Sequence, residues 1–208
     1  MVYKLSYFNI RGLAESTRLM LIDQGVAFED HRIERADWPK FKAEMTFGQI
    51  PVFYDGDEQI YQSATINRHL ARKLNLNGSN ESEITFIDMF YEAVRDVRKK
   101  YLQVIYGNYE QDKENLIKVI LPEQLTTVQK VFKTFCNGEK YIAGEKISYA
   151  DYEFFEVLDM ILVLDPTALD NFPTLKAFHG RMNSRPTLKS YLEKRAVSNI
   201  AINGNGKQ

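Results

Sequence analysis

Strand patterns are concentrated in the first third of this 208-residue chain, and this asymmetry constrains the fold more than any other feature of the sequence. Residues 2–8 alternate as a strand does, residues 13–25 have helical spacing, and residues 27–33 are typical of a second strand. A strand–helix–strand order predicts a parallel pair with a right-handed crossover. A polar, turn-rich segment at 76–81 ends this region, and the patterns after it are almost entirely helical.

The fold class that follows is α/β plus all-α. We expect a βαβ–ββα domain over residues 1–77 and an all-helical domain over residues 82–208. One helix of the second domain, at 149–164, is apolar nearly all round, which predicts a buried core helix. Ser148 and Asp151 form a capping box at its start, with aspartate in place of glutamate. The other long or short helices are expected at 83–109, 116–135, 173–184 and 186–194.

The segment 48–66 combines a hairpin, with a turn signal at its centre, and the start of a helix. Ile50 precedes Pro51, a bond that can be cis, and its backbone groups would be able to pair with an extended ligand. Ser63 is expected as the N-cap of the helix, and Gln62 and Ser63 together suit a carboxylate there. These features describe a slot for a small peptide, although a hairpin and a capped helix with a purely structural role would have the same pattern.

Composition excludes several classes of function. The formal net charge is −1, so no overall field favours nucleic acid or an anionic membrane. Apolar runs fall short of the ~20 residues that a membrane helix needs. The single cysteine, Cys136, excludes an internal disulfide and a CxxC redox pair, and we expect a reduced, cytoplasmic location. His31, His69 and His179 lack the spacing of metal ligands, so no metal site is expected.

Several scattered motifs are met in one order along the whole chain. They are Tyr7-Phe8, Trp38, Gln49-Ile50-Pro51 and Gln62-Ser63 in the N-terminal domain, and the capping box Ser148-Tyr149-Ala150-Asp151 in the helical domain. Together they resemble the cytosolic glutathione transferases, whose N-terminal domain is thioredoxin-like. Asp88-Met89, Arg95-Asp96, Lys100-Tyr101 and the ending at 202–208 resemble the Pi class of nematodes. The stretch 28–38 also resembles the Sigma class.

The resemblance implies an enzyme that conjugates reduced glutathione to hydrophobic electrophiles such as xenobiotics and lipid-peroxidation aldehydes. Glutathione is then a co-substrate, no cofactor is expected, and the enzyme is a cytoplasmic homodimer. Tyr7 matches the catalytic tyrosine, whose hydroxyl hydrogen-bonds the glutathione sulfur. The positions that match the glutathione site are Tyr7, Trp38, Lys42, Gln49, Ile50, Pro51, Gln62, Ser63 and, reaching in from the neighbouring subunit, Asp96.

The resemblance also places the second substrate and the dimer contact. Phe8, Ile10, Tyr106 and Gly204 match the hydrophobic substrate site. Phe47 matches the aromatic key that inserts between helices of the partner subunit.

One position departs from the family's pattern. Pi enzymes usually carry an arginine one turn after the tyrosine, as part of the glutathione site, and this chain has Leu13 there. Two other functions stay open. One is a glutathione-dependent isomerase, like the prostaglandin D synthases of the Sigma class. The other is a non-catalytic protein that holds apolar ligands.

Overall fold

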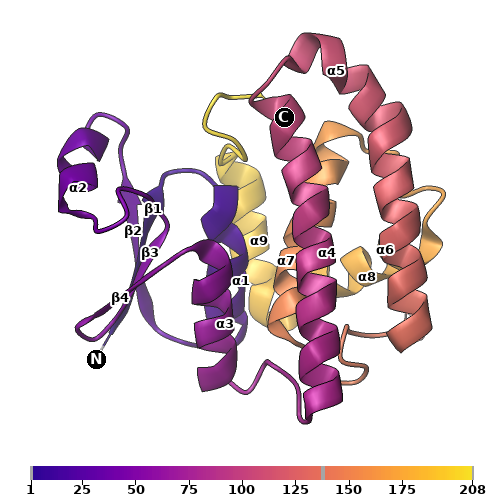
Figure 1. Cartoon of the computed structure of the whole chain (residues 1–208), viewed down its shortest axis with the longest axis horizontal. Coiled ribbons are helices and arrows are strands. Elements are labelled where there is room, and N and C mark those ends of the chain that lie inside the picture. The colour runs from indigo at the N-terminus through magenta and orange to yellow at the C-terminus, as the bar shows by residue number, and fades with distance from the viewer. Residues whose placement is uncertain (1, 137–138, 208) are drawn as a thin grey trace. The chain divides into compact units, whose positions relative to one another are not determined.

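A computed structural model describes residues 2–136 and 139–207 (Figure 1). The chain forms two compact units. The first runs to Leu74 and also includes Pro186–Gly206, and the second contains Asn75–Arg185 with Lys207. The change of unit after Leu74 lies close to the boundary expected from the turn-rich segment. The expected second domain, 82–208, would have included the segment 186–206, which the structure places in the first unit.

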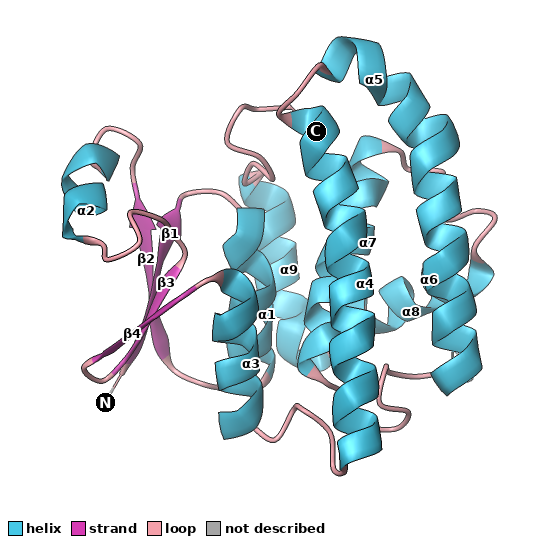
Figure 2. Cartoon of the chain, viewed as in Figure 1, coloured by secondary structure: helices cyan, strands magenta, loops and turns pink. Residues whose placement is uncertain are grey.

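The first unit contains a mixed four-stranded sheet in the order β2-β1-β3-β4 (Figure 2). β1 pairs parallel with β2 and antiparallel with β3, and β3 pairs antiparallel with β4. α1 and α3 lie on one face of this sheet, and α2 lies on its other side (Figure 1). The elements are β1 (Tyr3–Phe8), α1 (Glu15–Asp23), β2 (Phe28–Ile33), α2 (Trp38–Glu44), β3 (Val52–Asp55), β4 (Glu58–Tyr61), α3 (Ser63–Lys73) and α9 (Pro186–Ser198). The predicted order of strands and helices is confirmed.

The second unit is helical, as predicted. Its helices are α4 (Glu81–Ile105), α5 (Tyr109–Asn115), α6 (Leu121–Cys136), α7 (Tyr149–Leu164) and α8 (Pro173–Asn183). Two expected helices have different bounds. The helix expected over 83–109 ends at Ile105. Gly107 follows in a tight turn, where a Cβ would lie only 2.5 Å from the Gln103 carbonyl oxygen. The helix expected over 116–135 begins instead with a π-helical turn, Leu116–Ile120, and α6 starts at Leu121. Pro122 therefore falls in the first turn of α6, where its missing N–H costs little.

The capping box of α7 is confirmed. The Asp151 carboxylate accepts hydrogen bonds from Ser148 N–H and Ser148 Oγ, both at 2.7 Å, and from Ile142 N–H at 2.9 Å. The aspartate therefore joins the start of the helix to the loop before it. Phe154 and Phe155, among most other residues of α7, are buried, as expected for a core helix.

Asp151 should make stability depend on pH. Burial raises its pKa from the ordinary 3.8 to about 6, although the hydrogen bonds from Ser148 and Ile142 favour the carboxylate. Between these two values the folded state binds more protons than the unfolded chain, so this group stabilises the fold less as pH rises through about 6. We expect the difference in unfolding free energy between the native chain and Asp151→Asn to shrink from about pH 4 to about pH 7. Urea titrations at both pH values measure it, and a pH-independent difference would contradict the raised pKa.

Candidate active site

A buried tyrosine lies near the C-terminal end of β1, an interior strand of the sheet. Tyr7 is 7% exposed, and its hydroxyl oxygen accepts a 3.2 Å hydrogen bond from the backbone N–H of Leu13. Gly12 has φ +49°, and a Cβ there would lie 2.6 Å from the Tyr7 hydroxyl, so only glycine leaves room for the ring. A donor at the oxygen polarises the O–H bond. This makes the hydroxyl a stronger donor to a further acceptor.

The slot predicted from residues 48–66 lies at the start of β3 and of α3. The Ile50–Pro51 bond is cis, as predicted to be possible. Gln62 has φ +67°, uncommon for a residue with a side chain, and its Nε2 donates to Gln49 Oε1 at 3.1 Å. The structure thus brings together two amides that the sequence placed in one site. The expectation that Ser63 is the N-cap is wrong by one residue, since Gln62 holds that position and Ser63 is the buried first residue of α3.

An aromatic row connects α2 with Tyr7. Trp38, the first residue of α2, meets the Phe8 ring edge-on with centroids 5.4 Å apart, and Phe8 lies 5.9 Å from the Tyr7 ring. Lys42, one turn after Trp38, is exposed, and its Cε would be 3.6 Å from a Cβ on Gly48. The two residues predicted to hold one carboxylate, Trp38 and Lys42, therefore lie on one short helix beside the start of the slot.

Residues 10–12 connect β1 to α1 and pair with the C-terminal segment of the chain. The backbone N–H groups of residues 11 and 12 donate to the carbonyl oxygens of Ala201 and Ile202 at 2.9 and 3.0 Å. Ile10 is half-buried in this connection, and half-buried Gly204 follows Ile202 by two residues. Two of the positions predicted for the hydrophobic substrate site, Ile10 and Gly204, thus belong to segments that are hydrogen-bonded to each other.

Three other predicted residues are exposed. Asp96 lies on the surface of α4, and Tyr106, 56% exposed, caps the C-terminus of that helix. Both belong to the second unit. Phe47, in the first unit, is 60% exposed, and its ring centroid lies 4.9 Å from that of Tyr61.

Sequence reasoning proposed side chains for the site and missed the backbone groups around Tyr7. By sequence alone, Leu13 is notable only as the position where a Pi-class arginine is lacking. Its backbone N–H nevertheless reaches the Tyr7 hydroxyl, and that contact does not depend on the side chain. Gly12 was missed as well. A glycine between a strand and a helix is the signal that could have found it.

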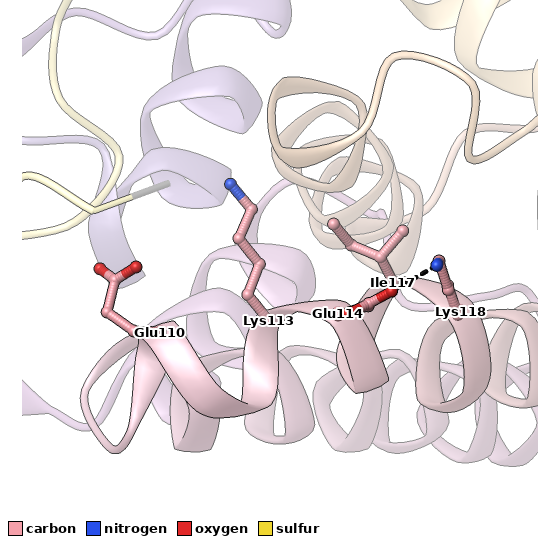
Figure 3. Close-up of a pocket in the computed structure, with 5 residues that line it drawn as sticks. All are labelled: Glu110, Lys113, Glu114, Ile117 and Lys118. Carbon is pink, nitrogen blue, oxygen red and sulfur yellow. Dashed lines mark hydrogen bonds and ion pairs between the residues drawn. The ribbon is translucent and has the colours of Figure 1, made fainter.

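A surface cavity of about 270 Å³ lies along α5 and the π-helical turn, within the second unit (Figure 3). Its lining is Glu110, Lys113, Glu114, Ile117 and Lys118. Within residues 2–136 and 139–207, no three His, Cys, Asp or Glu side chains are grouped so that they could hold a metal ion. No helix in this part of the chain is both long enough and apolar enough to cross a membrane.

The fold and the site together define a class of protein. A mixed sheet in the order β2-β1-β3-β4 with a cis-proline before β3 is a thioredoxin-like domain, and here a helical unit follows it. Family models agree with both parts. The model described as "Glutathione S-transferase, N-terminal domain" matches residues 3–72, and the one described as "Glutathione S-transferase, C-terminal domain" matches residues 95–195. The chain belongs to the glutathione S-transferase family.

Individual relatives refine this assignment. The chain is 56% identical to glutathione S-transferase 2 of Onchocerca volvulus over 208 residues, all of both chains. It is similar to the solved structure of the Onchocerca volvulus Pi-class glutathione S-transferase, with 55% identity, a TM-score of 0.98 and full coverage of both chains. It is also similar to the structure of prostaglandin synthase D of Nilaparvata lugens, with 32% identity, a TM-score of 0.84, and coverage of 94% of this chain and 98% of the other.

Proposed function

We propose that the chain conjugates reduced glutathione to hydrophobic electrophiles, and that Tyr7 stabilises the glutathione thiolate. The observation that carries this proposal is the buried Tyr7 hydroxyl, polarised by the Leu13 N–H. A free thiol has a pKa of ~8.5, so only a few per cent of it is the reactive thiolate at neutral pH. One charge-assisted hydrogen bond of ~1.5–3 kcal/mol lowers that pKa by roughly one to two units. A single well-placed tyrosine is therefore sufficient.

The rest of the site supports glutathione as the bound thiol. The backbone of Ile50, before the cis-proline, pairs with the cysteinyl unit. Gln62 and Ser63, at the N-terminus of α3, hold the γ-glutamyl end, because the positive end of the helix dipole favours a carboxylate. Trp38 and Lys42 on α2 hold the glycyl carboxylate, for which the exposed lysine supplies the charge.

Retention on immobilised glutathione, followed by the chlorodinitrobenzene assay, tests this function. We expect the chain to bind the resin, to elute with free glutathione, and to form the coloured conjugate. A chain that binds the resin and forms no conjugate would contradict the proposal and favour a non-catalytic protein that holds apolar ligands.

A second candidate is a glutathione-dependent isomerase, because the chain is similar to a structure named as a prostaglandin synthase D. Conjugation leaves glutathione in the product, whereas isomerisation releases it unchanged. Product analysis with a prostaglandin endoperoxide therefore separates the two candidates. Measurable isomer with little conjugate from any aryl halide, enal or epoxide would favour the isomerase.

Tyr106 provides a prediction about the electrophile. Its exposed hydroxyl, at the end of α4, is proposed to donate to the charge that develops on enones and epoxides. Tyr106→Phe should lower kcat/KM for these substrates by about tenfold and affect aryl halides much less, because the charge that develops on an aryl halide spreads over the ring and its nitro groups and is not concentrated on one oxygen. Kinetics on a panel of both classes measures the effect, with Tyr109→Phe, a buried tyrosine, as the control. Equal losses for both classes would contradict a donor role.

Phe47 provides a prediction about assembly. We propose a homodimer in which the exposed Phe47 ring is buried by the partner subunit and Asp96 reaches the partner's glutathione site. Phe47→Ser should raise the dimer dissociation constant by roughly 100- to 10,000-fold, since both subunits lose the ring and burying each Phe contributes about 1.5–3 kcal/mol. Sedimentation measures it. Val197→Ser, at another exposed apolar residue, is the control, and an unchanged dissociation constant for Phe47→Ser would exclude the proposed contact.

A further inference from the structure

A buried cluster of charges joins α1 to α9 within the first unit. Arg18 and Glu15 of α1 are 0% and 1% exposed, and Arg18 Nη1 lies 3.0 Å from Glu15 Oε2. Arg18 Nε donates to Asp30 Oδ1 of β2, also at 3.0 Å. The other Glu15 oxygen accepts from the Tyr191 hydroxyl at 2.8 Å and from Arg195 Nη1 at 3.0 Å. Glu15 is therefore the acceptor that α1 and α9 share.

The same cluster holds the turn that carries the donor to Tyr7. Arg18 Nη1 donates to the carbonyl oxygens of residues 10 and 11 at 2.9 and 3.3 Å. The backbone N–H groups of residues 11 and 12 donate to the carbonyl oxygens of residues 201 and 202. Leu13 comes next, and its N–H reaches the Tyr7 hydroxyl. The position of that N–H is thus set by Arg18 on one side of the turn and by the segment after α9 on the other.

Electrostatics keep this cluster ionised at neutral pH. Burial alone would raise the pKa of Glu15, but the attraction of Arg18, Arg195 and Arg11 outweighs burial and holds that pKa below its ordinary value. The carboxylates of Glu15 and Asp30 likewise raise the pKa of Arg18 against the effect of burial. A neutral side chain in place of Glu15 would leave two guanidinium groups without their common counter-ion.

We propose that Glu15 is a positioning residue for Tyr7: it anchors Arg18 to α9, and Arg18 holds the turn that places the Leu13 N–H on the Tyr7 hydroxyl. This deepens the proposed function and rests on Tyr7 as the stabiliser of the thiolate. The last helix of the chain then takes part in activating the sulfur through a relay of hydrogen bonds.

Titration of bound glutathione tests the inference, with the ultraviolet absorbance of the thiolate as the readout. Glu15→Gln keeps the size of the side chain and removes its charge. This substitution should raise the apparent pKa of the bound thiol by about one unit. At pH values well below that pKa, the fraction of bound glutathione that is thiolate should then fall roughly tenfold. At pH values below the pKa of the bound thiol, glutathione affinity should change less than about twofold, because the slot itself is untouched and the thiol is protonated in both proteins. Tyr191→Phe removes one hydrogen bond to Glu15 and should give a smaller shift in the same direction.

Thr187→Val is the matched control. Thr187 Oγ1 hydrogen-bonds to Asp23, so it joins α9 to the far end of α1 without reaching the turn. The Thr187→Val variant should have lower stability than the native chain and an unchanged pKa of the bound glutathione thiol. An equal pKa shift in Thr187→Val would overturn the inference, because loosening α9 anywhere would then be sufficient.

A double-mutant cycle with Tyr7→Phe separates the inference from the function on which it rests. In the Tyr7→Phe background, Glu15→Gln should cause no further shift. If Tyr7→Phe itself leaves the thiol pKa unchanged, the proposed function fails. If Tyr7→Phe raises the pKa and Glu15→Gln does not, or if the Glu15→Gln shift persists without the tyrosine hydroxyl, the inference alone is overturned. If Glu15→Gln does not fold, Tyr191→Phe takes its place, and an unchanged pKa of the bound thiol in that variant overturns the inference.

Discussion

Tyr7→Phe should lower kcat/KM at about pH 6.5 by roughly 50- to 100-fold, because the bound thiol would return to the pKa of ~8.5 of a free thiol. The native hydroxyl, buried and polarised by Leu13, supplies the hydrogen bond that is lost. Glutathione affinity should change little, since the groups that hold both ends of the peptide remain. Steady-state kinetics across about pH 6–9 measures the effect, and the loss should shrink as the thiol ionises unaided.

Tyr3→Phe is the matched control for this experiment. Tyr3 lies on the same strand, with its ring centroid 5.2 Å from that of Phe53. Removing the Tyr3 hydroxyl should leave the rate unchanged at every pH. A loss in Tyr7→Phe that is equal at all pH values would contradict thiolate stabilisation. It would indicate that the ring positions the substrate instead.

Local patterns were sufficient to predict most of the fold. Alternation in residues 2–8, the turn signal of the hairpin and the capping box of α7 each depend on neighbours in sequence, and all three appear in the structure. The place of α9 could not be predicted in this way. It joins the first unit through hydrogen bonds from Arg195 and Tyr191 to the buried Glu15, which lies at the opposite end of the sequence. Nothing in the local pattern of 186–194 marks that partner.

The site likewise contains groups that local sequence patterns predicted and groups that they did not. The side chains of the slot stand in short motifs, and the cis bond before Pro51 and the pairing of Gln49 with Gln62 fit the site that those motifs predicted. Tyr7 by itself is an ordinary strand residue, and only the resemblance to a family marked it as catalytic. The Leu13 N–H has no sequence signature, because nearly every residue has a backbone N–H group. Its contact with Tyr7 depends on the position of the turn, which the sequence does not show.

Asp151→Ala should cost about 3–5 kcal/mol of unfolding free energy, a large effect for a residue with no proposed part in the chemistry. The change removes the acceptor of three buried hydrogen bonds, from Ile142 N–H, Ser148 N–H and Ser148 Oγ. Each buried donor left unsatisfied costs about 1–3 kcal/mol. Relief of the burial that raises the Asp151 pKa offsets part of the sum. Urea unfolding at neutral pH measures the difference.

Asp165→Ala is the matched control, because its carboxylate also accepts from a backbone N–H and a hydroxyl, at a half-buried position that solvent reaches. Asp165, at the other end of α7, accepts from Thr167 N–H at 2.9 Å and Thr167 Oγ at 2.7 Å. Water can replace these bonds, so the expected cost is less than about 1 kcal/mol. Equal costs at the two positions would contradict the role given to burial. Turnover per folded molecule should match the native chain in both variants, since an aspartate that only caps a core helix changes how much protein folds and leaves the reaction rate as it was.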